Sequence, residues 1–294
     1  MFANYITIST IILLINPSTI FGQTTLSGKV IDKNTSKGIP YATVGLVKQN
    51  TGTTTDQYGT FLIKPISKND SIIVSSVGYY TLTMPLSRLN EDSVIPLQLK
   101  ESNLPELVIL SKSSSIIEVN HFSNCSSNYY SGDQIVVTQL AQYFDAPKIN
   151  MKLKEVSLCK VKGKSLFRIH IYDIDSISGK PSVALTPTSI LVNSSDRSVK
   201  IDLDKYDIVV PKKSFFIAIE WLYLPSNEAK VKTKFNDKKV NIKSYYPWIS
   251  YRQTNSKEEE KTIKRLWFLN FNGTWSEMFP MYKKLNFLIS AKLL

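Results

Sequence analysis

The sequence predicts an all-β protein that contains two β-sandwich domains. The 294 residues are rich in Tyr, Phe, Ile, Val and Thr, which are the residue types that favour strands. Short segments of alternating apolar and polar residues recur at regular intervals, with turn-forming residues between them, as in sandwich proteins. Amphipathic runs rich in Ala or Leu are absent. The length of the chain suffices for one large or two ordinary domains.

The N-terminus predicts export. Residues 1–22 contain no charged side chain, and the run from Ile6 to Ile15 is mostly apolar. This pattern is typical of a secretory signal peptide cleaved near Gly22 and Gln23. An uncleaved anchor is the alternative, because the leader lacks Lys and Arg. No later apolar segment is long enough to span a bilayer. We therefore expect no transmembrane span after cleavage and a location in the periplasm, on the outer-membrane surface or outside the cell.

The first domain is predicted to span residues 23–110. Regular alternation ends before a Ser-rich segment, which places the boundary near Lys112. Residues 111–120 are then a linker, and residues 121–294 are the second domain. The expected strands of the first domain are residues 26–32, 41–48, 61–65, 71–80 and 93–99.

The second domain is expected to be a larger, jelly-roll-like sandwich, because its strands are joined by long connections. Residues 124–134 are polar and predict a loop, whereas residues 135–145 fit either a strand or a short helix. Long connections are expected at residues 176–187 and over most of 225–262, and residues 257–265 are a charged connection or a short helix. Clear alternation predicts the remaining strands at residues 165–173, 199–203, 214–224 and 285–294.

Alternation also assigns side chains of the second domain to opposite faces of its strands. One face is apolar and is expected to point into the core, with Phe167, Ile169, Ile171, Phe215, Ile217, Ile219 and Trp221. The opposite face carries Arg168, His170, Tyr172, Ala218 and Glu220.

The net charge of +12 is unevenly distributed along the chain. Residues 23–110 hold 8 basic and 7 acidic side chains, whereas residues 111–294 hold 28 and 17. The basic second domain fits an acidic polymer or an anionic surface as partner, or simply a lysine-rich soluble surface. No nucleic-acid-binding motif accompanies the charge, so we expect no nucleic-acid partner.

The chain contains two cysteines, Cys125 and Cys159. Two cysteines do not make a disulfide-dense scaffold. In an exported protein they could form one bridge, but two free, buried thiols fit the sequence equally well. The sequence leaves this choice open.

No residue pattern predicts a metal, a cofactor or a catalytic set. His121 and His170 are the only histidines, and neither has the spacing of a zinc site. Asp173 and Asp175 could begin a calcium loop, but the residues after them break the ligand pattern. The segment KGKS at 162–165 lies between two expected strands rather than before a helix, so it is not a phosphate loop. We therefore expect no enzyme activity, and a hydrolase built from scattered carboxylates is the weakest hypothesis.

Aromatic side chains are the remaining candidates for ligand binding. The segments YYPWISY (245–251) and FNGTW (271–275) fall in expected loops. Exposed rings at the loops of a sandwich can stack on the apolar face of a sugar, but they can also pack into the domain. The candidate binding residues are Tyr245, Tyr246, Trp248 and Trp275.

The segment TTTDQYGTFLI at 53–63 predicts a turn rather than a ligand site. Asp56 can accept local backbone N–H bonds, and Gly59 can take a backbone angle closed to other residues. Phe61 then enters the next strand with its ring available to the core. We assign these residues structural roles.

Ordered motifs across the first domain resemble the carboxypeptidase-regulatory-like domain that is common in exported Bacteroidota proteins. They are a Gly-x-Val-x-Asp start, a Pro-x-Ala-x-Val strand, the Thr-x-x-Asp-x-x-Gly-x-Phe segment and a final Gly-Tyr. The motif residues are Gly28, Val30, Asp32, Pro40, Ala42, Val44, Thr53, Asp56, Gly59, Phe61, Gly78 and Tyr79. The resemblance covers about residues 24–100 and implies a transthyretin-like seven-stranded sandwich in the cell envelope or outside the cell. The region after it resembles no family closely enough to be assigned.

Together these observations predict a non-catalytic exported cell-envelope protein that acts as a binding or scaffolding module. Its partner would be an envelope protein or a glycan. The alternative is a carbohydrate-binding protein that uses the aromatic residues of the second domain.

Overall fold

The computed structural model describes residues 25–67, 69–90, 92–101, 115–131, 137–186, 188–235, 238–253, 266–278 and 285–294. The predicted signal peptide, the end of the first predicted domain at 102–110 and the charged segment at 257–265 lie outside these ranges. The regular structure in these ranges is strand, apart from three short 3₁₀ turns: η1 (Leu86–Arg88), η2 (Asp204–Tyr206) and η3 (Pro225–Asn227). The predicted all-β class is confirmed. Among these residues, no helix has the length and apolar character needed to cross a bilayer.

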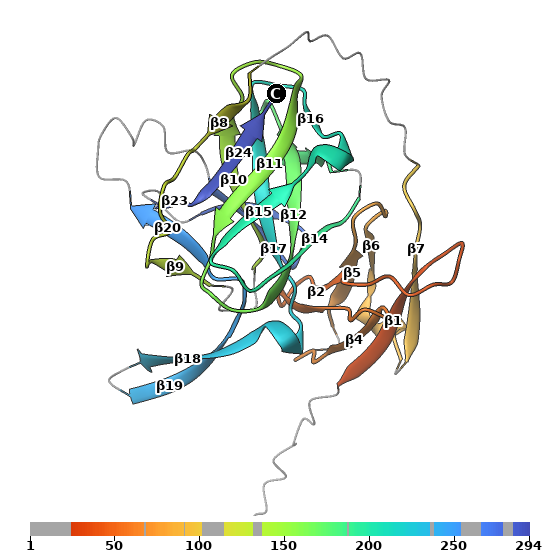
Figure 1. Cartoon of the computed structure of the whole chain (residues 1–294). Coiled ribbons are helices and arrows are strands. Elements are labelled where there is room, and N and C mark those ends of the chain that lie inside the picture. Colours follow the sequence, from red (N-terminus) through yellow and green to blue (C-terminus); the bar gives the residue numbers. More distant parts are fainter. Residues whose placement is uncertain are drawn as a thin grey trace, which may run out of the picture.

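The first domain is a sandwich of a three-stranded and a four-stranded sheet (Figure 1). Alternating side chains such as Val30, Val44 and Ile72 are fully buried between the sheets. The seven strands confirm the predicted sandwich. The first sheet has the order β4 (Thr60–Ile63), β1 (Leu26–Asp32) and β7 (Ser93–Leu97), and the second has the order β3 (Thr51–Thr54), β2 (Thr43–Leu46), β5 (Ser71–Ser75) and β6 (Leu82–Pro85).

Motif residues of the first domain lie at its corners. Asp56 Oδ1 accepts hydrogen bonds from the amides of Tyr58 and Thr60, both at 2.8 Å. Gly59 adopts a φ of +82°, which favours glycine. At another corner, Asp32 Oδ1 accepts the amide of Thr35, and its Oδ2 accepts the Tyr79 hydroxyl at 3.0 Å. Asp56 and Asp32 hold their turns in place by local hydrogen bonds, whereas Tyr79 joins Asp32 from 47 positions along the chain.

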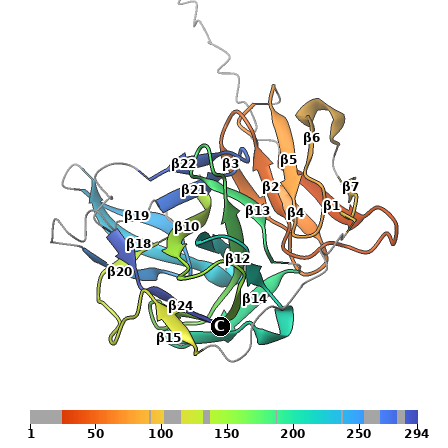
Figure 2. The same cartoon turned by 90° about the horizontal axis from the view of Figure 1, so that it is seen from above.

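The second domain packs two sheets around the larger hydrophobic core, which includes Leu153, Phe167, Ile217 and Phe287. One sheet has the order β13 (Pro181–Ala184), β12 (Ser165–Ile174), β17 (Ser214–Trp221), β10 (Val137–Asp145), β21 (Leu266–Asn270) and β22 (Trp275–Glu277), with β14 (Ile190–Ser194) also paired to β12. The other has the order β15 (Ser198–Asp202), β11 (Met151–Cys159), β24 (Ile289–Leu293) and β8 (Ile117–Val119), with β16 (Val209–Val210) also paired to β11. Figure 2 shows the two domains side by side.

Several boundaries differ from those the sequence predicts. Strand β8 falls inside the predicted linker, because Ile117 to Val119 pair with β24. A short strand β9 (Tyr129–Tyr130) lies inside the predicted loop at 124–134. Residues 137–145 form a strand, not a helix. Strands β8 and β9 lie at the edges of their sheets, where polar or charged side chains can face water and so resemble a loop.

The predicted long connection after residue 225 also contains strands. These are β18 (Glu228–Phe235) and β19 (Lys238–Tyr245), which form a two-stranded ribbon, and β20 (Ile249–Gln253), which pairs with β9 and with β23 (Leu285–Phe287). The ribbon extends from the lower part of the domain (Figure 1).

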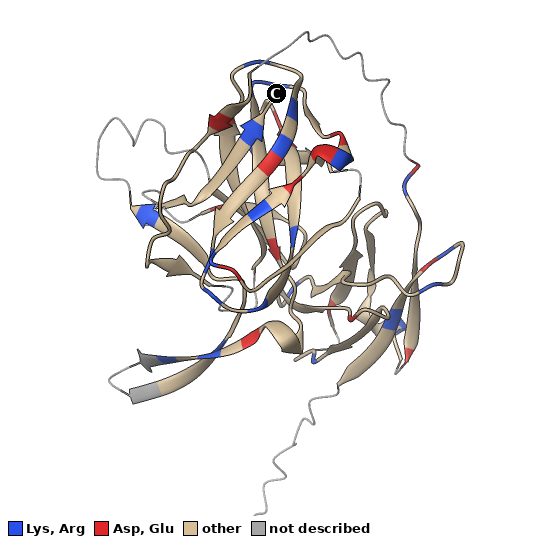
Figure 3. Ribbon diagram, in the orientation of Figure 1, with Lys and Arg blue, Asp and Glu red and all other residues tan. Residues whose placement is uncertain are grey.

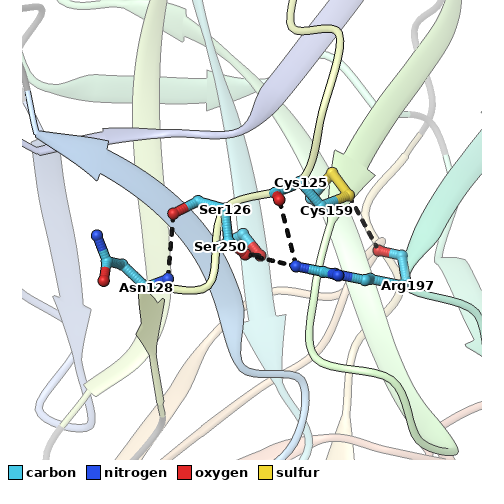
Figure 4. Close-up of a disulfide and its surroundings, with 6 residues drawn as sticks. All are labelled: Cys125, Ser126, Asn128, Cys159, Arg197 and Ser250. Carbon is cyan, nitrogen blue, oxygen red and sulfur yellow. Dashed lines mark hydrogen bonds between the residues drawn. A yellow bond between two sulfur atoms is a disulfide. The ribbon is translucent and has the colours of Figure 1, made fainter.

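A disulfide joins Cys125 to Cys159, with the two Cα atoms 5.5 Å apart (Figure 4). Cys159 is the last residue of β11, and Cys125 lies on the segment between β8 and β9. Nearby, Arg197 Nη2 donates to the backbone oxygens of Cys125 and Ser126, at 3.2 and 3.0 Å. The two cysteines therefore form a disulfide rather than two free thiols. The disulfide links the segment before β9 to strand β11.

Candidate functional site

Three ionisable side chains are buried on the face of the large sheet that points away from the main core. Arg168 and His170 come from β12, and Glu220 comes from the neighbouring strand β17. Their exposed fractions are 2, 4 and 2 %. Register pairs Arg168 directly with Glu220, and His170 with Ala218. The first domain covers this end of the sheet and supplies the remaining hydrogen-bond partners.

Both oxygens of the Glu220 carboxylate accept hydrogen bonds. Its Oε2 accepts from Arg168 Nη1 at 2.8 Å and from His170 Nε2 at 2.6 Å. Its Oε1 accepts from the hydroxyl of Thr43 in the first domain at 2.9 Å. An ionised carboxylate only accepts, so the proton of His170 that faces it is on Nε2. We call Arg168, His170, Glu220 and Thr43 the interface cluster.

Arg168 links the same cluster to the backbone of the first domain. Its Nη2 donates to the carbonyl oxygen of Tyr41 at 2.9 Å, and its Nε donates to Ser189 Oγ at 2.7 Å. Each guanidinium nitrogen therefore has a partner, and one of the three partners belongs to the other domain. A buried guanidinium needs such complete pairing, because an unpaired buried charge is strongly destabilising.

Electrostatics keep Glu220 ionised. Burial raises the pKa of Glu220, but the positive charge of Arg168 and the hydrogen bonds from His170 and Arg168 outweigh this and hold the pKa at about 2. Next to it, burial raises the pKa of Tyr172, and the charge of Glu220 raises it further. Glu220 is therefore a stable anion, matched to a cation at the domain boundary.

Phe271 forms the second part of the domain boundary. It lies in the turn between β21 and β22 and is 2 % exposed. A Cβ atom on Gly45 would lie 2.2 Å from its carbonyl oxygen, and one on Gly52 would lie 2.3 Å from its ring. The two glycines are paired on β2 and β3, so their missing side chains let the second domain approach the sheet closely.

Two further hydrogen bonds cross the boundary. The amide of Tyr223 donates to Thr54 Oγ1 at 3.0 Å, and the amide of Asn272 donates to Asn50 Oδ1 at 3.2 Å. The boundary thus combines an ion pair, close backbone packing and directed hydrogen bonds.

The four predicted aromatic residues do not form one platform. Tyr245 is 7 % exposed and its ring packs edge-on against Tyr223, with ring centres 4.8 Å apart. Trp275 packs edge-on against Tyr172 on the outer face of the large sheet, at 5.5 Å. Both belong to strands, β19 and β22, rather than to the loops that the sequence predicts.

Tyr246 and Trp248 do lie together. Their rings stack with centres 5.1 Å apart and an angle of 28° between the planes. Both are half-buried, and they flank Pro247, whose peptide bond with Tyr246 is cis. This pair is the part of the predicted aromatic set that offers two adjacent, partly exposed rings.

Sequence reasoning places Arg168, His170 and Glu220 on one face but does not find the interface cluster. The available signal is Glu220 itself, which is the one charged residue between Phe215 and Leu224. A single carboxylate in such an apolar run indicates a buried, paired charge, because unpaired carboxylates are almost never fully buried.

The predicted carboxylates near β12 have structural partners. Asp173 pairs with Lys212 at 2.9 Å, and Asp175 Oδ1 accepts the amides of Ile177 and Ser178 in the following turn. Within the described ranges, no group of three or more His, Cys, Asp or Glu side chains could hold a metal ion.

Comparisons with known proteins identify the first domain. No curated protein matches the chain. Among solved structures, the cysteine protease and lectin-like domains of Cwp84, a surface layer associated protein of Clostridium difficile, are 13% identical with a TM-score of 0.34, covering 79% of this chain and 47% of that one. A clostridial Cwp84 variant after propeptide cleavage is 12% identical with a TM-score of 0.36, covering 86% of this chain and 64% of that one.

At these TM-scores the two Cwp84 structures carry no argument about this chain, which also spans only about half to two thirds of their length. The family comparison is specific. A model described as the CarboxypepD_reg-like domain matches residues 26–109. This range contains the ordered motifs from Gly28 to Tyr79 and all seven strands of the first sandwich. Residues 26–109 are therefore a CarboxypepD_reg-like domain, as the sequence predicts.

Proposed function

We propose that the protein is a non-catalytic, exported component of the cell envelope in which the two sandwiches act as one rigid binding or scaffolding unit. The observation that carries the proposal is the domain boundary, where Glu220 accepts hydrogen bonds from both domains. A scaffold has to present its surfaces in a fixed orientation, and a buried, fully paired charge between domains supplies such specificity.

The chemistry of the interface cluster supports a structural role. General acid–base catalysis needs a group that can exchange a proton with a substrate. Both oxygens of Glu220 are occupied and the cluster is covered by the first domain. Its side chains therefore hold the domains together rather than face a substrate.

The disulfide supports export. Bridges such as Cys125–Cys159 persist in oxidising compartments and are rare in the cytosol. Cell fractionation followed by N-terminal sequencing tests this part of the proposal. We expect a mature chain that begins near Gln23 outside the cytoplasm, and an intact chain found in the cytoplasm would contradict it.

Replacing Gly45 with alanine is expected to separate the domains. The new methyl group would lie 2.2 Å from the carbonyl oxygen of Phe271, whereas its nearest contact within the first domain is 3.1 Å. Overpacking of this kind costs roughly 1–3 kcal/mol. We expect the wild-type protein to unfold in one calorimetric transition and Gly45→Ala to unfold in two, with a larger radius of gyration in solution scattering.

The matched control is Thr60→Ala, an exposed position on β4 of the same domain. This variant should unfold in one transition, as the wild type does. Two transitions in the wild-type protein itself would contradict the rigid unit. An unshifted transition and an unchanged radius for Gly45→Ala would show that the close approach of Phe271 to Gly45 is not what holds the domains together.

A carbohydrate-binding role is a second proposal, favoured by the stacked and partly exposed rings of Tyr246 and Trp248. Aromatic faces of this kind bind sugar rings by stacking. Retention on insoluble polysaccharides should fall at least about tenfold in Trp248→Ala, since a stacked ring contributes roughly 0.5–1.5 kcal/mol beyond the area it buries. Trp275→Ala should bind as the wild type does, because Trp275 packs against Tyr172 instead. Equal retention of all three proteins would contradict this role.

A further inference from the structure

The ribbon formed by β18 and β19 is attached to the body of the protein at one end. Its two strands pair with each other and with no other described strand, and Figure 1 shows the ribbon extending away from the second domain. An isolated two-stranded ribbon is at best marginally stable in water. The structure therefore keeps an extended element that contributes little to either sheet of the sandwich.

Register places lysines opposite one another at two positions of the ribbon. Lys230 pairs with Lys243, Lys232 pairs with Asn241, and Lys234 pairs with Lys239. Residues 228–245 contain six lysines and two carboxylate residues, and Figure 3 shows basic residues on the coloured part of the ribbon, next to the second domain. Like charges directly opposite each other destabilise a strand pair.

Among the described residues, little neutralises this charge. Lys243 Nζ pairs with Glu228 at the base of the ribbon, at 2.8 Å. Lys230 and Lys232 are exposed, and neither has an ion-pair partner among the residues that the structure describes. An external anionic partner would relieve the repulsion between these amines.

The other face of the ribbon is apolar. Val231, Val240 and Ile242 alternate with the exposed lysines and are half-buried. Val231 and Ile242 are direct cross-strand partners. Among the residues whose side chains the structure describes, the ribbon is therefore amphipathic, with Lys230, Lys232 and Lys243 on one face and branched aliphatic side chains on the other. An acidic polymer would use the first face alone, whereas a lipid surface would use both.

We propose that the β18–β19 ribbon binds the surface of a membrane that contains anionic lipids. An amphipathic element lies in the interface with its apolar face buried by about 5–10 Å at the boundary of headgroups and acyl chains. The ribbon is about 10 Å thick across its side chains, so its lysine amines would lie at the level of the lipid phosphates. The proposal gives the envelope role stated above a specific partner, and it rests on that role.

The test uses the mature protein in a sedimentation assay with vesicles of phosphatidylcholine alone or with one third phosphatidylglycerol. Each lysine near an anionic surface strengthens binding about fivefold. We expect binding to the anionic vesicles only, weakened by at least about 30-fold in Lys230→Glu/Lys232→Glu. In high salt the lysines are screened, and the residual binding should be lost in Val231→Thr/Ile242→Thr, which keeps residues that favour strands.

The charge-matched control is Lys162→Glu/Lys164→Glu, two exposed positions in the turn between β11 and β12. It lowers the net charge by the same amount and should bind the vesicles within about twofold of the wild type. Equal losses in the two lysine variants would show a general charge effect and would overturn the proposal. So would binding to an acidic polysaccharide such as alginate with no binding to vesicles.

The result is independent of the domain boundary. If the protein failed to bind vesicles, we would still expect the wild type to unfold in one transition. The rigid two-domain unit would therefore not be contradicted. Separation of the domains in the wild-type protein would contradict the rigid unit. It would not affect the proposal that the ribbon binds membranes.

Discussion

Replacing Glu220 with alanine is expected to lower the free energy of unfolding by about 3–5 kcal/mol, because removing one partner of a buried ion pair leaves the other charge unpaired. In this variant Arg168 would stay 2 % exposed without its carboxylate. Thr43 would also lose the acceptor that joins it to the second domain. Urea unfolding at neutral pH measures the change.

The pKa of Glu220 predicts how the difference in unfolding free energy between the wild type and Glu220→Ala depends on pH. Its folded-state pKa of about 2 lies below the ordinary value of 4.5. A group with a lowered pKa stabilises the folded state above its unfolded pKa, and this contribution is lost as the pH falls towards the folded pKa. The gap in stability between the wild type and Glu220→Ala should therefore be constant above about pH 5 and should narrow between about pH 4.5 and pH 2.

Glu155→Ala is the matched control, because it removes a carboxylate that pairs with Lys292 at 2.9 Å on a partly exposed part of the second domain. Pairs of this kind contribute roughly 0–1 kcal/mol. If Glu220→Ala cost no more than Glu155→Ala, the interface cluster would not be the buried, paired charge described above. Replacing Arg168, His170 and Glu220 together by apolar residues should restore much of the loss.

The second large effect concerns the disulfide. Cys125 and Cys159 are 34 residues apart, and cross-linking a loop of this length stabilises a protein by about 4 kcal/mol through the entropy of the unfolded chain. Replacing both cysteines with serine should lower the free energy of unfolding by an amount close to this value. Chemical unfolding under non-reducing conditions measures it.

Treatment with a reductant provides the control for the serine variant. The wild-type protein with dithiothreitol should match Cys125→Ser/Cys159→Ser, and the variant itself should not respond to the reductant. Unchanged stability of the wild type on reduction, with free thiols confirmed by mass spectrometry, would show that the bridge does not hold the segment before β9 to the sheet.

The fold of the first domain follows closely from its sequence because its specifying residues act locally. The hydrogen bonds of Asp56 reach residues two and four positions along the chain, and Gly59 takes the backbone angle that such a turn needs. Interactions between residues so close in the sequence can be predicted from the sequence motif itself. Their order therefore identified the family as well as the turn.

The second domain was predicted less completely. Alternation placed the clear strands, but β8, β18 and β19 fell in segments expected to be linker or connection. Their polar and charged residues resemble a solvated loop. Whether such a segment pairs depends on a partner strand distant in the chain, such as β24 for β8, which local patterns do not reveal.

The sequence by itself determined the all-β class, the family of residues 26–109 and the two faces of β12 and β17. Only the tertiary structure showed that the first domain covers the face with Arg168, His170 and Glu220. It also showed that Phe271 packs against Gly45 and Gly52. Alternation shows which side chains share a face because it follows from backbone geometry. It does not show what covers that face, since this depends on residues such as Thr43, 177 positions away from Glu220.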